Sequence, residues 1–64
     1  MEKVAYFYAY EVRVSQDATR QGSGVFSVGK DAPPDYIKGE AERIASSESG
    51  YHESQIILTA LNQI

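Results

Sequence analysis

The chain has 64 residues, of which 42% are hydrophobic, and it carries a formal net charge of −3 with a pI near 4.9. A chain of this length forms a single domain, residues 1–64, with a small hydrophobic core. Its acidic balance gives no overall basic field that would attract nucleic acid or anionic lipid, so a nucleic-acid partner is not the first expectation.

The usual covalent and metal supports of small domains are missing from the sequence. It has no cysteine and one histidine, His52, so we expect no disulfide, no metal site and no cofactor. Self-association is the support that remains for so small a core. We therefore expect a homodimer. An adequate monomer is the alternative, because many domains of about 55–65 residues fold alone.

No apolar run approaches the length of about 18 residues that spans a bilayer. The first residues lack the basic end and long apolar centre of a signal peptide and lead directly into a strand pattern. We expect a soluble, cytoplasmic protein with no membrane partner.

Residues 3–14 alternate strictly between two faces, which predicts a long β-strand. The even face is continuous and apolar, with Val4, Tyr6, Tyr8, Tyr10, Val12 and Val14. The odd face carries Lys3, Ala5, Phe7, Ala9, Glu11 and Arg13. Three of the five tyrosines lie on the even face, so their burial or exposure matters for any function.

The polar residues 15–19 predict a turn, and residues 20–28 predict a second strand. Because Gly22 and Gly24 weaken its first half, we expect an edge strand with a flexible, twisted start. Residues 29–34 break the pattern, and Pro34 suits the first position of a helix. The helix is predicted over residues 34–47, with a narrow apolar stripe of Ile37, Ala41, Ile44 and Ala45, and with Gly50 as its left-handed stop.

A third strand is predicted from residue 51 or 52 to residue 62, apolar on both faces at its centre. The order is β-β-α-β, an α+β fold. Because the first strand is the longest and most apolar, we place it at the centre of a three-stranded antiparallel sheet in the order 2-1-3. The helix packs on one face, which gives a two-layer sandwich.

One short helix covers only one face of this sheet. We assign it to the even face, which leaves an open face with a predicted partner surface of Phe7, Val25, Ile57 and Leu61. If the helix covers the odd face instead, the tyrosines are exposed. Aromatic side chains on a sheet can stack with bases. The alternative function is therefore single-stranded nucleic-acid binding through Tyr6, Tyr8, Tyr10, Arg13 and Arg20.

The carboxylates, the histidine and the glycine-rich run of the sequence do not form a catalytic pattern. The carboxylates of Asp35, Glu40, Glu42 and Glu48 fit a solvated helix face, because acid-base work needs a cleft that separates their pKa values. His52 has no nucleophile placed beside it by a motif. The run Gly22-Ser23-Gly24 precedes a strand and not a helix, so it does not match a phosphate loop. We expect no catalytic residues and no enzyme.

The tyrosine-rich first strand, the glycine-rich second strand and the apolar last strand resemble small uncharacterised proteins of bacteriophage and prophage origin. This resemblance implies a bacterial or phage accessory protein and carries over no catalytic residue. The predicted function is a small non-enzymatic protein-interaction module that binds itself or another protein.

Overall fold

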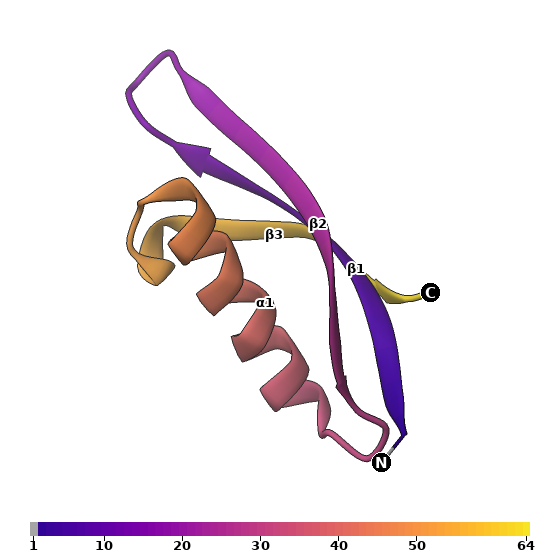
Figure 1. Cartoon of the computed structure of the whole chain (residues 1–64). Coiled ribbons are helices and arrows are strands. Elements are labelled where there is room, and N and C mark those ends of the chain that lie inside the picture. The colour runs from indigo at the N-terminus through magenta and orange to yellow at the C-terminus, as the bar shows by residue number, and fades with distance from the viewer. Residues whose placement is uncertain (1) are drawn as a thin grey trace.

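The computed structural model describes residues 2–64. Strands β1 (Lys3–Arg13) and β2 (Thr19–Gly29) are followed by helix α1 (Pro34–Ser49), a short 3-10 helix η1 (Glu53–Gln55) and strand β3 (Ile56–Gln63). The sheet is antiparallel with the order β2-β1-β3, and α1 lies on one of its faces (Figure 1). The predicted α+β class, element order and strand order are confirmed.

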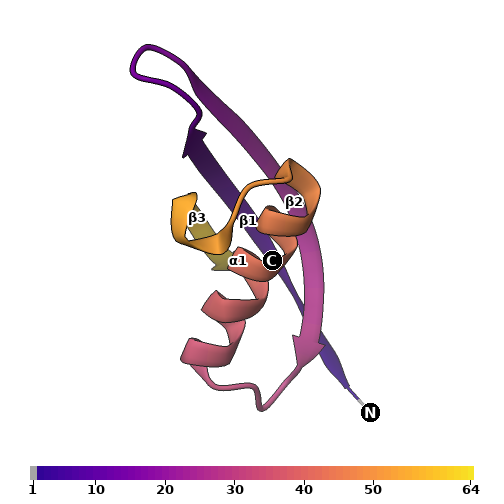
Figure 2. The same cartoon turned by 90° about the vertical axis from the view of Figure 1, so that its left-hand side faces the viewer.

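The β1–β2 hairpin is the longest feature of the molecule. Its register runs from Lys3 opposite Gly29 to Arg13 opposite Thr19. Backbone hydrogen bonds between Ser15 and Ala18, at 3.2 and 3.4 Å, close the turn. The turn projects beyond the C-terminal end of α1, so the hairpin is longer than the layer that covers it (Figures 1 and 2).

The two glycines of β2 have a role that the sequence did not predict. Gly24 pairs with Tyr8, and Gly22 pairs with Tyr10. A methyl group on Gly24 would lie 2.7 Å from the Tyr8 hydroxyl oxygen, and one on Gly22 would lie 2.4 Å from that of Tyr10. The tyrosine rings therefore occupy the space above the glycines. The strand runs through both positions without a break, and each glycine is packed under an aromatic ring.

Helix α1 begins and ends where its sequence predicts a break. Pro34 opens it, and the acidic Asp35 lies in the first turn, where the helix dipole favours negative charge. Gly50 stops it with a left-handed φ of 81°, and its N–H donates to the Ser46 carbonyl at 2.9 Å. The helix is two residues longer than predicted, with Ser49 as its last residue.

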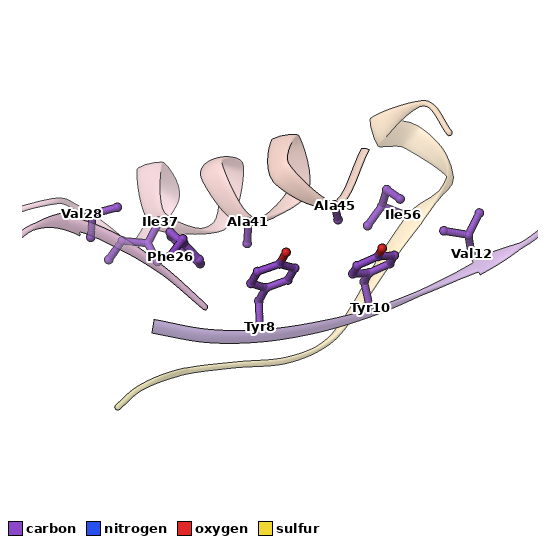
Figure 3. Close-up of a cluster of buried hydrophobic side chains, with 9 residues drawn as sticks. All are labelled: Tyr8, Tyr10, Val12, Phe26, Val28, Ile37, Ala41, Ala45 and Ile56. Carbon is purple, nitrogen blue, oxygen red and sulfur yellow. The ribbon is translucent and has the colours of Figure 1, made fainter. Parts of the chain in front are cut away.

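The core lies between α1 and the even face of β1, as expected. Tyr8 and Tyr10 point from β1 toward Ala41 and Ala45 of the helix (Figure 3). The two rings stack at 6.1 Å, and the two alanines are fully buried. The cluster consists of Tyr8, Tyr10, Val12, Phe26, Val28, Ile37, Ala41, Ala45 and Ile56. Small residues in both layers thus make room for large aromatic ones.

Strand β3 begins later than predicted. In place of strand at residues 51–55, the chain forms a bend followed by η1. The Ser54 N–H donates to His52 Nδ1 at 3.1 Å, and the His52 N–H donates to Gln55 Oε1 at 3.2 Å. This reciprocal capping satisfies the backbone of a helical turn and so competes with the strand. His52 has a structural role in this turn.

Strand β3 also changes register halfway along. Ala9 pairs with Ala60, whereas Tyr10 pairs with Leu58, so Thr59 is an extra residue in β3. Such a bulge reverses the relation between sequence parity and face beyond that point. Ile57 and Leu61, four residues apart, therefore lie on opposite faces of the sheet.

Candidate functional site

The face of the sheet that α1 leaves uncovered is the candidate site. It is formed by the odd positions of β1, which pair with the odd positions of β2. Phe7 pairs with Val25 and Asn62, and Glu11 pairs with Gln21 and Ile57. No element formed by residues 2–64 covers this face, so it meets solvent across all three strands (Figure 1).

Large apolar side chains on this face are exposed. Val25 retains 61% of its accessible surface and Ile57 retains 54%, while Phe7 is partly buried between its neighbours. Ala5 and Ala9 flank Phe7 on the same strand, so the aromatic ring stands above small residues. A hollow of about 460 Å³ lies beside it, lined in part by Ala9, Ser23 and Thr59. The face thus combines exposed apolar side chains with a hollow that has both polar and apolar side chains in its lining.

Three of the four predicted partner-binding residues occur together here. Phe7, Val25 and Ile57 are on the open face, but Leu61 is not. Leu61 pairs with Tyr8 and packs against the core under α1, because the bulge at Thr59 moves it to the covered side. The predicted place of Leu61 on the open face is therefore wrong. Ala60 takes the position on the open face opposite Ala9.

The alternative surface is not assembled. Tyr8 and Tyr10 are 1% and 7% exposed, and Tyr6 is partly buried in a stack with Phe26 at 5.9 Å. The rings of Tyr8 and Tyr10 lie in the core under α1, and Tyr6 packs against that core. Arg20 pairs with Val12 on the helix side, whereas Arg13 pairs with Thr19 on the open side. The two arginines therefore lie on opposite faces of the hairpin.

The charges of the open face are at its two ends. Lys3 stands at one end of β1, and Glu11 and Arg13 stand at the other, with the apolar residues between them. The ion pairs formed among residues 2–64 are Lys30 with Glu2 and Arg43 with Glu40, at 3.5 and 2.9 Å. Neither involves a charge of the open face.

The Tyr8 hydroxyl is the most perturbed titratable group of the core. Burial raises the pKa of Tyr8 far above its ordinary value of 10.0, and the hydrogen bond it donates to the Glu48 carboxylate raises the pKa further. This bond joins the centre of β1 to the C-terminal end of α1. The arrangement anchors the helix to the sheet and offers no proton at a solvent-facing cleft.

The surface of residues 2–64 outside the open face has a hollow beside α1 but no cluster of metal-binding groups. Among residues 2–64 no three His, Asp or Glu side chains lie close enough to hold a metal ion. A hollow of about 550 Å³ beside the start of α1 is lined mainly by apolar atoms around Ala32, Pro33 and Tyr36. In the same part of the chain, no helix has both the length and the apolar character needed to cross a membrane.

Comparison with protein-family models, with curated proteins and with solved structures finds no match to this chain.

Proposed function

We propose that this chain is a non-enzymatic protein-interaction module that assembles with a second copy of itself through the open face of the sheet. The observation that carries the proposal is the exposure of Val25, which pairs with Phe7, and of Ile57, which pairs with Glu11, on a face that no element of residues 2–64 covers. Large apolar side chains exposed on an uncovered sheet face can mark a protein–protein interaction site.

The exposed surface of the chain is somewhat larger than that of a compact monomer, as its projecting hairpin requires. The structure exposes 4491 Å², whereas a compact monomer of 7.1 kDa exposes about 4,100 Å². A second sheet packed on the open face would supply the third and fourth layers and complete an apolar core on both sides of β1. Protein is favoured over nucleic acid as the occupant, because the tyrosine rings that would stack with bases are beneath α1.

The size of the open face bears on how tightly two copies would bind. Residues Tyr6–Val12 of β1 pair with both neighbours. With strands about 4.8 Å apart and about 3.3 Å per residue, this three-stranded area projects over roughly 300 Å². Stable interfaces bury about 800 Å² of accessible surface on each partner. We therefore expect a reversible dimer with a dissociation constant in the micromolar range. An accessory role in the cytoplasm, as the resemblance to phage and prophage proteins implies, belongs to the same proposal.

Sedimentation equilibrium over about 1 to 500 µM tests the dimer directly. We expect the wild-type chain to move from a monomer mass of 7.1 kDa toward twice that value as its concentration rises. Val25→Lys should remain monomeric, because it would bury an unpaired charge in the interface while leaving the monomer fold untouched.

Tyr36→Lys is the matched control. Tyr36 is also an exposed large side chain, with 52% of its surface accessible, but it lies on α1 away from the open face. It should dimerise as the wild type does. A wild-type chain that stays monomeric at 500 µM, or a Val25→Lys chain that dimerises normally, would contradict the proposal.

A further inference from the structure

The open face has a charge pattern that is complementary to itself. Read along β1, its side chains are Lys3, Ala5, Phe7, Ala9, Glu11 and Arg13. From Lys3 to Glu11 the pattern is symmetric in size about Phe7 and opposite in charge at its two ends, and Arg13 follows Glu11 on the same face. A second copy laid over it in the reverse direction would place unlike charges together at both ends.

Two symmetric arrangements can join the open faces of two copies. In both, a two-fold axis lies between the sheets, as closed dimers require. If the axis runs along β1, the strands are parallel and each residue lies over its own equivalent. If the axis crosses β1 at Phe7, the strands are antiparallel, Phe7 lies over Phe7, and Lys3 lies over Glu11. Sheets packed in either way differ in mean strand direction by about 30° because of their twist.

The charges select between these arrangements. The parallel one would stack Lys3 on Lys3, Glu11 on Glu11 and Arg13 on Arg13, and like charges brought together across an interface are unfavourable. The antiparallel one forms two Lys3–Glu11 pairs and leaves Arg13 beyond the start of the opposing β1. Neither Lys3 nor Glu11 is engaged in an ion pair within residues 2–64, so both are available.

Resting on the proposed self-association, we propose that two copies pack their open faces with antiparallel β1 strands, so that Lys3 of each copy pairs with Glu11 of the other. Phe7 and Val25, which pair with each other, lie over their own equivalents in this arrangement and supply the attraction, and the two end pairs fix the direction and register. The pairs lie at the rim, where charges contribute more to specificity than to affinity.

A charge-reversal cycle tests the register. Lys3→Glu and Glu11→Lys should each raise the dimer dissociation constant by about tenfold, because each turns two attractive pairs into two repulsive ones. The double variant Lys3→Glu/Glu11→Lys should restore the wild-type constant. Because both side chains are at the surface of the monomer, circular dichroism should report an unchanged fold for all three.

Cross-linking gives a second, independent measure of strand direction, since the sequence contains no cysteine of its own. With a short bis-maleimide, a mixture of Ala5→Cys and Ala9→Cys chains should form 5–9 cross-links in preference to 5–5 cross-links. The opposite preference, or single charge reversals that leave a measurable dimer unchanged, would overturn the antiparallel register while leaving self-association intact. A wild-type chain that never dimerises would overturn both.

Discussion

At the scale of single residues, the core depends on tyrosines that combine large apolar area with one polar atom. Tyr8 is 1% exposed, yet its hydroxyl finds a partner in the Glu48 carboxylate. Buried tyrosine hydroxyls generally need such a partner. The ring supplies packing beneath Ala41, and the hydroxyl secures the last turns of α1, so one side chain links both layers.

The pKa of Tyr8 leads to a prediction about alkaline pH. Because the folded chain holds this proton more tightly than the unfolded chain, folding is favoured below pH 10 and loses free energy as pH rises above it. The loss from Tyr8 is up to about 1.4 kcal/mol per pH unit, until the folded group itself ionises. Tyr8→Phe should remove this part of the slope.

Urea unfolding of the wild type and Tyr8→Phe at pH 8 to 12 measures the difference. At pH 8 the variant should be less stable by about 0.5–1.5 kcal/mol, because it lacks the hydrogen bond to Glu48. Above pH 10 its stability should decline less steeply than that of the wild type. Tyr36→Phe, at an exposed position, controls for the loss of a tyrosine hydroxyl. Parallel stability curves for wild type and Tyr8→Phe would refute this account.

At the scale of elements, the pairing of β1 with β2 joins aromatic residues to glycines. Tyr8 and Tyr10 lie opposite Gly24 and Gly22, and each ring covers the glycine that it pairs with. Cross-strand aromatic contact of this kind offsets the weak strand preference of glycine. The glycines therefore define how closely the rings approach the sheet and, through the rings, the height at which α1 packs.

Gly24→Ala should destabilise the fold by about 1–3 kcal/mol, the usual cost of overpacking a closed core. The added methyl group would lie 2.7–2.9 Å from Tyr8 atoms, and the buried ring has no free space into which to move. Gly29→Ala is the control in the same strand. A methyl group there meets nothing within 4 Å, and only Gly50 among the described glycines has a positive φ. That variant should be neutral or slightly stabilised in thermal unfolding.

Elements with a periodic pattern or a clear end signal could be predicted from the sequence, and those that depend on local contacts could not. Strict alternation in residues 3–14 predicts β1, because the side chains of a strand point to its two faces in turn. The length and apolar character of this strand predict its central place. Pro34 and Gly50 predict the limits of α1 to within two residues. The capping of η1 and the bulge at Thr59 depend on contacts between side chain and backbone that have no periodic signal. Because of the bulge, Leu61 lies on the covered face and not on the open face that strand alternation predicts.

The open face could be predicted from the same alternation, since it needs only the count of covering elements. Phe7 follows from it without knowledge of register, whereas Val25 also needs the register between β1 and β2. The sequence favours burial of the tyrosines but does not settle it, because β1 has apolar residues on both faces. The packing of Gly22 and Gly24 under the rings required the register between β1 and β2, which the sequence does not specify.

At the scale of the whole molecule, the chain is more extended than a domain of its size usually is. Its radius of gyration is 12.2 Å, against about 10.7 Å for a compact domain of this length. The hairpin accounts for the difference, because it extends past the end of α1 (Figure 1). A small core and an extended sheet together make the stability of this fold sensitive to whatever covers the open face.

The proposed self-association through that face would have a thermal consequence. Because only folded chains would form the dimer, mass action should raise the melting temperature with protein concentration. For a domain of this size we expect a rise of about 3–5 °C for each tenfold increase above the dissociation constant. Scanning calorimetry between about 20 µM and 1 mM covers the relevant range. The Val25→Lys variant should melt at one temperature throughout, because it has no dimer to populate, whereas Tyr36→Lys should retain the wild-type dependence. A melting temperature of the wild type that is independent of concentration would mean that the open face contributes nothing to stability in solution, and the small core would then have to support the fold alone.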